Sequence, residues 1–331
     1  KRCVRHLEVA YAASERKAHQ DLRHYAELRA KSAATAGEQF AVEFVLKLLK
    51  KRMFSSPSAF AVTLEKHAQS VSGAQRGADG TAWQRQLEEA DNDFANDEDY
   101  ETTALEAIET ASRNVAPLVA EEKALLAELR EFAAHAAGLA DSKARRLVQW
   151  LKDALKPGGQ WSDRRVIIFT EYRATQKWLH DLLAAEELGG QDRLLTIYGG
   201  MASEDRERIK AAFQADPALS PVRILLATDA ASEGINLQNH CWQLIHYEIP
   251  WNPNRMEQRN GRVDRHGQKH PEVHVHHFVG AGFDQTKPGQ APGDLEGDLE
   301  FLLRAAIKVE AIREDLGKVG PVIASQVEEA M

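Results

Sequence analysis

The most informative stretch of this sequence is Gln258-Arg-Asn-Gly-Arg-Val-Asp-Arg-His-Gly-Gln268. The preceding pair Asn252-Pro253 predicts a helix start, with Asn as the N-cap and Pro at the first helical position. If the helix continues through the stretch, Gln258, Arg262 and Arg265 project from one side of it. That side would carry two permanent cations, whose planar guanidinium groups suit the charge of a transferred phosphoryl group.

Gly261 lies inside this stretch and would let another backbone approach closely. An exposed basic helix is the alternative interpretation, because Arg255 and Arg259 show that the predicted helix carries charge elsewhere too. On the eleven residues alone both interpretations stay open, and the flanking sequence is needed to favour one.

Upstream, residues 223–238 indicate a short strand that runs into a loop of small polar residues. The apolar run Ile224–Leu226 is typical of a strand buried on both faces. Thr228, Ser232 and the backbone around Gly234 can donate to phosphate oxygens without demanding a particular base. An ordinary strand-to-helix connection is the alternative for this loop.

Strands and helices alternate from about residue 165 to residue 280. This order predicts an α/β fold, a parallel sheet with helices on both faces. In such sheets the functional site lies at the carboxyl ends of the strands. The predicted strands are marked by Val166, Leu194, Ile224, Leu244 and Val273, and the loops expected at those ends contain Thr170, Gly199, Thr228 and Asn252.

The chain resembles the Swi/Snf-related ATPases of helicase superfamily two, whose last conserved motif reads approximately Q-x-x-G-R-x-x-R-x-G-Q. Residues 258–268 match every fixed position, and Glu248-Ile-Pro-Trp-Asn-Pro-Asn254 looks like the segment that leads into this motif. The resemblance implies a second RecA-like lobe in which Arg262 and Arg265 are arginine fingers toward ATP bound by a first lobe. The Pro-Trp-Asn-Pro version is closest to the bacterial and archaeal branch, which includes an ATPase that recycles RNA polymerase and a helicase-like anti-phage component.

The resemblance also assigns the other site residues. Glu233 departs from the pattern of many eukaryotic relatives, and its charge beside the expected DNA path suits the organisation of arginines better than contact with nucleic acid. Ser203 is expected to cap the helix that follows Gly199-Gly200. Implied in the ATP cleft are Gln258, Gly261, Gly234 and Asp264; implied at nucleic acid are Thr170, Tyr172, Gly199, Gly200, Thr228, Asp229, Ser232 and Asn236.

The sequence contains no G-x-x-x-x-G-K-[ST] loop and no strand ending in Asp-Glu that would hold magnesium. We therefore expect ATP and Mg²⁺ to be bound mainly by a first lobe that precedes Lys1, and we expect the 331 residues alone to be inactive. No metal site is expected on this chain itself. His274, His276 and His277 sit in a predicted strand without an accompanying cysteine.

Three regions are predicted along the chain. Residues 1–140 are expected to form a mostly α-helical protrusion, helical from its first residues, with a mobile acidic loop at about 70–101. Residues 141–280 form the predicted RecA-like lobe, and residues 281–331 a linker and helical tail. In the protrusion, the basic run 47–52 is either a solvated face or a track for a DNA backbone.

The composition argues against several classes of protein. A net charge of −8 argues against a free-standing DNA-binding module, and Cys3 and Cys241 are too few and too distant for a disulfide framework. No apolar stretch reaches the length of a membrane span, and no signal peptide is visible, so a cytoplasmic, nucleoid-associated protein is expected.

The predicted function is therefore the second lobe of an ATP-dependent translocase on double-stranded DNA, with a first RecA-like lobe of the same protein as its partner. RNA polymerase and defence-system proteins, the latter implying phage defence, are the candidate external partners. An RNA or strand-separating helicase is one alternative, because the same motifs would serve it. A catalytically idle interaction module is the other, and a P-loop lysine before Lys1 would distinguish the motor from it.

Overall fold

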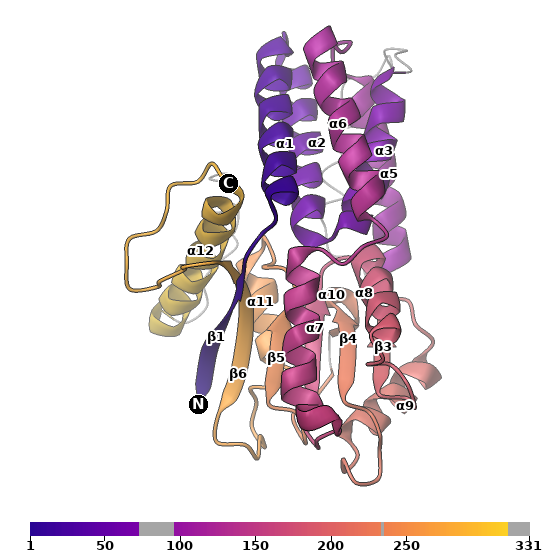
Figure 1. Ribbon diagram of the computed structural model, residues 1–331, viewed down its shortest axis with the longest axis vertical. Coiled ribbons are helices and arrows are strands. Elements are labelled where there is room, and N and C mark those ends of the chain that lie inside the picture. Colours follow the sequence, from indigo (N-terminus) through magenta and orange to yellow (C-terminus); the bar gives the residue numbers. More distant parts are fainter. Residues whose placement is uncertain (73–95, 233–234, 317–331) are drawn as a thin grey trace. The chain divides into compact units, whose positions relative to one another are not determined.

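The computed structural model describes residues 1–72, 96–232 and 235–316, and the chain divides into two compact units (Figure 1). The sheet unit contains Lys1–Tyr11, Ser142–Glu171 and the described part of Gln176–Met331. The helical unit contains Ala12–Asp141 and Tyr172–Thr175. The predicted Gly234 contact and most of the predicted acidic loop lie outside the described residues.

The sheet unit is built on six strands in the order β1-β6-β5-β2-β4-β3, and every neighbouring pair is parallel. All five predicted strands are present, and the predicted parallel α/β fold is confirmed. Strands β2 and β4 are buried along their whole length, as their continuous apolar runs require. The strands are β1 (Arg2–Val9), β2 (Val166–Thr170), β3 (Leu194–Ile197), β4 (Ile224–Thr228), β5 (Gln243–His246) and β6 (Val273–Gly280).

The opening of the chain corrects one prediction. Arg2–Val9 was expected to be helical, yet it forms β1, which pairs with β6 from Arg2 opposite Val273 to Val9 opposite Gly280. The helical unit is therefore inserted in the sequence between β1 and the rest of the sheet unit. The two paired strands lie about 270 residues apart, so the sequence around Arg2–Val9 contains no sign of its partner. The partner of an edge strand is set by tertiary packing.

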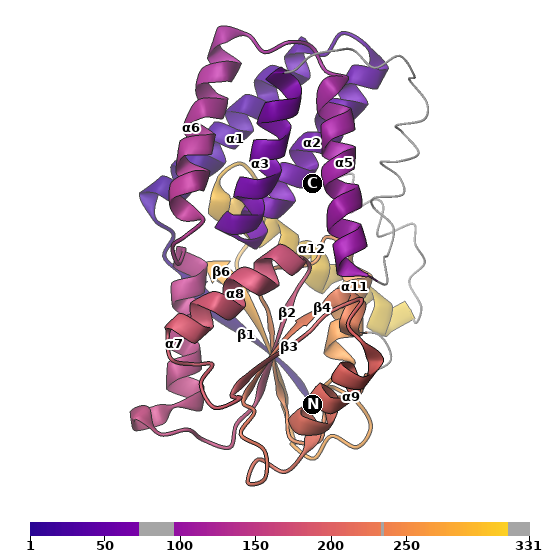
Figure 2. The same ribbon diagram turned by 90° about the vertical axis from the view of Figure 1, so that its right-hand side faces the viewer.

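Helices cover both faces of the sheet. Figure 2 shows α7 and α8 on one face and α9 and α11 on the other, the arrangement that right-handed crossovers give for this strand order. Helix α12 packs on β6 and α11. The bounds are α7 (Ser142–Leu155), the 3₁₀ turn η1 (Pro157–Gly159), α8 (Arg173–Ala185), α9 (Ser203–Gln214), α10 (Asp229–Ser232), α11 (Pro253–Asn260) and α12 (Leu295–Leu316).

Helix α9 corrects a second prediction. Ala202 occupies the N-cap position and Ser203 is the first helical residue, and the cap makes no side-chain hydrogen bond. Glu204 and Asp205 lie in the first turn, where they complement the helix dipole.

Two buried arginines secure the amino ends of the strands. Arg165, just before β2, donates from Nε to the Val222 carbonyl at 3.0 Å. Arg223, just before β4, donates from Nε to the Ser162 carbonyl at 2.6 Å and from Nη1 to the Ser220 carbonyl at 2.8 Å. These side chains satisfy loop carbonyls at the edge opposite to the one expected to be functional.

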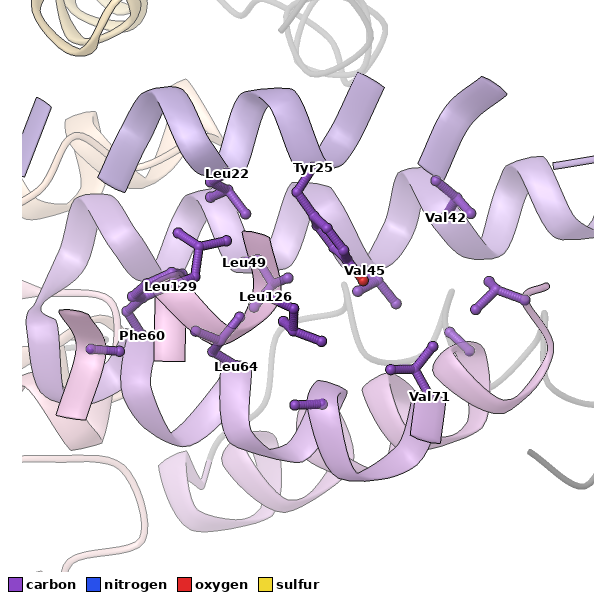
Figure 3. Packing of buried hydrophobic residues seen from close by; sticks show 14 of the residues in the cluster. Leu22, Tyr25, Val42, Val45, Leu49, Phe60, Leu64, Val71, Leu126 and Leu129 are labelled. Atoms are coloured by element: carbon purple, nitrogen blue, oxygen red, sulfur yellow. The ribbon is translucent and has the colours of Figure 1, made fainter. Parts of the chain in front are cut away.

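The helical unit has its own apolar core, shown in Figure 3. Leu22, Leu49, Leu64 and Leu126 are buried, each from a different helix. This core also contains a buried polar pair, in which the Tyr25 hydroxyl lies 2.7 Å from His67 Nε2. The helices are α1 (Ala13–Ser32), α2 (Ala36–Ser55), α3 (Pro57–Ser72), α5 (Asp97–Arg113) and α6 (Ala120–Ala136).

Arg52, the last residue of the basic run, follows neither of its two interpretations. Its side chain is buried, pairs with Glu101 at 2.9 Å and lies over the Tyr172 ring at 3.8 Å. Thr175, in the same short segment as Tyr172, hydrogen bonds Ser55 at 2.6 Å. Tyr172 was predicted to contact nucleic acid; in the structure its ring instead packs within the helical unit.

Candidate functional site

Strands β5, β2 and β4 are neighbours in the sheet, and their carboxyl ends bring three polar segments together. Thr170 stands opposite Thr228 in the register of β2 and β4. The Thr170 hydroxyl donates to Glu248 Oε1 at 2.8 Å, and the same carboxylate accepts from the Glu171 amide. Burial raises the pKa of Glu248, while the nearby Arg259 and Lys143 act against that rise.

Thr170 was predicted to contact nucleic acid. Its side chain is buried and its hydroxyl is already bound to Glu248. Thr228 is buried as well. The exposed part of the site is therefore supplied by the segments that follow.

Helix α11 begins as predicted but is shorter than the prediction required. Asn252 is the N-cap, with its side chain accepting from the Asn254 amide at 2.9 Å. The helix ends at Asn260, so Gln258 projects from it while Arg262 and Arg265 lie in the turns that follow. The expectation that these three side chains share one helix face is wrong, because the helix terminates first.

Gly261 also departs from its prediction. A Cβ at this position would lie 3.3 Å from the Glu257 carbonyl and 3.7 Å from the Gln258 carbonyl, both in its own helix. No other element approaches it among the described residues. Gly261 terminates α11, and its amide donates to the Glu257 carbonyl at 2.9 Å.

Arg259 is the fully buried side chain that ties α11 to the strand ends. Its Nε and Nη2 donate to the two oxygens of Asp229 at 2.5 and 2.7 Å, and Nη1 donates to the Glu248 carbonyl at 3.1 Å. Burial opposes the charge, but Asp229 outweighs it and the pKa of Arg259 is raised. Asp229 was predicted to contact nucleic acid; both of its oxygens instead accept from this arginine.

The arginine segment 262–266 runs beside the loop segment 235–238. The Leu237 amide donates to the Arg262 carbonyl at 3.0 Å, and Arg262 Nη1 donates to the Ile235 carbonyl at 3.4 Å. Arg265 donates to the side chain of Asn236, and both of these side chains are exposed. The structure thus brings together the residues predicted for phosphoryl chemistry and for nucleic acid.

Strand β1 reaches the same segment. Arg2 Nε donates to Asp264 Oδ2 at 2.9 Å, and Arg2 Nη1 donates to Glu257 Oε1 at 2.5 Å. Asp264, predicted in the ATP cleft, is therefore held by the first strand of the chain. One guanidinium joins α11 to the turn that carries Arg265, and this limits the movement of that turn.

Gly267 and Gln268 close the arginine segment. Gly267 has a φ of +91°, a conformation that side chains with a Cβ rarely adopt. The turn directs Gln268 inward, where its amide donates to the Cys241 carbonyl at 2.9 Å and to the Val263 carbonyl at 3.1 Å. The last glutamine of the motif therefore has a structural role.

The buried His246 ring lies beside Arg259 and stacks on the ring of His277, whereas His276 packs against Trp150. Arg259 Nη1 lies 3.3 Å from His246 Nδ1, and a guanidinium only donates, so the proton of His246 sits on Nε2 and is donated to Asn260 at 2.9 Å. Burial lowers the pKa of His246 well below its usual value, and it lowers those of His276 and His277 to about 3. These imidazoles are neutral core side chains. Within the described ranges, no group of three or more His, Cys, Asp or Glu side chains is arranged to hold a metal.

The remaining predicted contacts lie in two loops. Gly200 has a φ of +85° and is exposed in the turn after β3, next to the buried Gly199. Ser232 ends α10, and nothing is described of its side chain; Gly234 lies outside the described residues.

Arg259 and Arg2 were missed from the sequence. Arg259 was counted as surface charge, although its place four residues after Arg255 aligns both with Asp229 at the end of β4. An acidic residue directly after a buried strand was the available signal. No sequence signal pointed to Arg2, because its partners are more than 250 residues away along the chain.

Residues 144–267 match the family described as helicase conserved C-terminal domain. This part of the chain is therefore similar to helicase C-terminal domains. The chain is 37% identical over 139 residues to the uncharacterized ATP-dependent helicase YqhH of Bacillus subtilis, which covers 42% of the chain and 22% of that protein. It is 31% identical over 129 residues to the RNA polymerase-associated protein RapA of Erwinia tasmaniensis, covering 39% of the chain and 12% of RapA.

The fold has a solved counterpart in the SWI2/SNF2 ATPase C-terminal domain of Sulfolobus solfataricus. The TM-score is 0.50 at 13% identity, and the comparison covers 98% of this chain and 92% of that domain. The chain spans only about a fifth or an eighth of the length of the curated relatives above. No described helix is both long and apolar enough to cross a membrane.

Proposed function

We propose that the sheet unit is the second motor lobe of an ATP-dependent translocase on double-stranded DNA. The observation that carries the proposal is the pairing of two segments at the carboxyl edge of the sheet, 262–266 and 235–238. One segment has the cations that phosphoryl transfer needs, and the other has small polar groups suited to a phosphate backbone. The similarity to an ATP-dependent helicase supports the same assignment.

In this proposal Arg262 and Arg265 place positive charge against ATP held by a first lobe. Guanidinium groups stabilise the charge that spreads over the equatorial oxygens in the transition state. Arg265 suits this task because its side chain is exposed and can leave Asn236 for a phosphate. We assign Mg²⁺ to the first lobe and derive no step from a metal on this chain.

Nucleic acid would bind along the loops after β3 and β4, through Gly199, Gly200, Asn236 and neighbouring backbone amides. Contacts of this kind are to phosphates, so little sequence specificity and a strong dependence on salt are expected. When ATP draws the lobes together, the hydrogen bonds between 235–238 and 262–266 pass the movement from one segment to the other. Repeated closure would advance the lobe along the duplex.

RNA polymerase is the external partner that we would test first, because one relative is RNA polymerase-associated. Phage-defence proteins are the second candidate, on the resemblance alone. Co-purification of the complete protein with polymerase, followed by the same experiment with phage-infected cells, separates the two settings.

The experiment measures ATP hydrolysis by the complete protein that carries this chain, without nucleic acid and with duplex DNA, single-stranded DNA or RNA. Strong stimulation by duplex DNA is expected, and Arg265→Ala should reduce the rate by about 10³-fold or more. Arg208→Ala is the matched control, since Arg208 is an exposed arginine that pairs with Asp205 of the same helix, α9. Equal rates for parent and Arg265→Ala, or no hydrolysis under any condition, would refute the proposal.

A further inference from the structure

Arg259 is the most completely engaged cation at the site, although it is not one of the two proposed fingers. Its exposed fraction is 0%, and all three of its guanidinium nitrogens donate to groups of the sheet unit. Two bonds go to Asp229, and Nη1 lies near the Glu248 carbonyl and His246 Nδ1. A buried charge with this number of partners holds its surroundings in one geometry, because any displacement leaves several polar groups unpaired.

The two residues of this pair begin the two functional segments. Asp229 is the first residue after β4 and lies six residues before Ile235. Arg259 is in the last turn of α11, three residues before Arg262. The segments then meet again through the bonds between Arg262 and Ile235 and between Leu237 and Arg262. The two segments are therefore joined twice, by the Asp229–Arg259 pair and by the bonds of Arg262 to Ile235 and Leu237.

A second arginine extends the base to strand β2. Arg255, one turn before Arg259 on α11, lies 3.4 Å from Glu171 and 3.8 Å from Asp229. The carboxylates at the ends of β2 and β4 are thus both linked to α11. These ion pairs fix the position of α11 relative to the ends of β2 and β4.

We propose that Arg259 is a positioning residue that, through its two-pronged bond to Asp229, locks the loop after β4 to the arginine segment so that nucleic acid bound at the loop sets the position of Arg262 and Arg265. The inference rests on the proposed function and deepens it by naming the internal connection. Arg259 itself does not reach substrate, because it is enclosed within the lobe.

Lysine is the informative substitution at this position. It retains the charge and most of the side-chain length, but an ammonium cannot make two parallel bonds to one carboxylate in the fixed geometry of a guanidinium. Arg259→Lys should therefore preserve the fold and lose the lock. Arg223→Lys is the matched control, since Arg223 is also buried and multiply bonded but lies at the amino end of β4.

The test uses the complete protein and measures kcat and KM for ATP with and without duplex DNA, together with the thermal midpoint. In Arg259→Lys the stimulation of kcat by DNA should fall at least tenfold, while KM for ATP changes less than about threefold. Arg223→Lys should lower the thermal midpoint comparably and keep the stimulation of the parent. Asp229→Asn should reproduce Arg259→Lys. Equal stimulation in Arg259→Lys and Arg223→Lys would overturn the inference.

Amide hydrogen exchange distinguishes failure of this inference from failure of the proposed function. In Arg259→Lys the amides of 235–238 should exchange at least tenfold faster than in Arg223→Lys, whether or not the parent hydrolyses ATP. Faster exchange in Arg259→Lys, without any ATPase activity in the parent, would support the positioning role of Arg259 and refute the proposed translocase function. Unchanged exchange in Arg259→Lys, together with DNA-stimulated hydrolysis in the parent, would refute the positioning role of Arg259 and support the proposed translocase function.

Discussion

The buried histidines of β6 predict a loss of stability in mild acid. His276 and His277 are 5% and 1% exposed, and burial lowers the pKa of each to about 3. In the unfolded chain both would titrate near 6.5. Below that pH these histidines are protonated in the unfolded state but stay neutral in the folded state. The free energy of unfolding is therefore highest above pH 6.5 and falls as the pH drops toward 3.

The size of the effect follows from these values. Between pH 7.5 and 5.5 each histidine should cost about 1.4 kcal/mol of unfolding free energy. Two such groups cost about 3 kcal/mol, and His246, whose pKa is also lowered, acts in the same direction. For a urea dependence of about 2–3 kcal/mol per M, the unfolding midpoint should fall by about 1 M or more.

Urea unfolding followed by tryptophan fluorescence at pH 7.5, 6.5 and 5.5 measures this loss, because Trp150, Trp161, Trp178, Trp242 and Trp251 all lie in the sheet unit. Replacing His277 with Phe should remove about half of the contribution that the two β6 histidines make to the pH dependence. His180→Gln, at a half-exposed histidine of α8, should leave the pH dependence unchanged. A midpoint that is flat or higher at pH 5.5 would refute the reasoning.

Three further substitutions test the site's framework. Arg2→Ala should cost about 1–2 kcal/mol of stability through its lost bonds to α11 and the following turn, whereas Arg5→Ala on the same strand should stay within about 0.5 kcal/mol; equal losses in urea unfolding would argue against the clamp. Gly267→Ala should cost about 1–3 kcal/mol because of its positive φ, compared with little change for Gly138→Ala, and calorimetry decides. Asn252→Ala should lower the thermal midpoint by an amount equivalent to about 1 kcal/mol through loss of the α11 cap, and an unchanged midpoint would contradict that role.

Local patterns were sufficient for much of this lobe. The apolar runs at Val166 and Ile224 were identified as buried strands, and both are. Asn252-Pro253 was identified as a helix start, and α11 begins there. These features depend on neighbouring residues only, so the amino-acid order is enough to predict them.

The length of α11 and the identity of its partners were not accessible in this way. The helix stops at Asn260, and residues 262–266 pair instead with a loop some thirty residues earlier. Arg259 was classed as surface charge because its burial depends on Asp229, which only the sheet brings near. A polar side chain can be buried only where tertiary packing supplies its partners, and no local pattern contains them.

Local sequence patterns were enough to predict the parallel α/β sheet and the segment that carries the arginines. The tertiary structure decided that the chain's first residues form an edge strand, that Arg2 clamps the arginine segment, and that Asp229 faces Arg259 instead of solvent. The physical reason is separation along the chain. Hydrophobic periodicity and capping act over a few residues, whereas these ion pairs join residues 30 to more than 250 positions apart and exist only after the sheet has assembled.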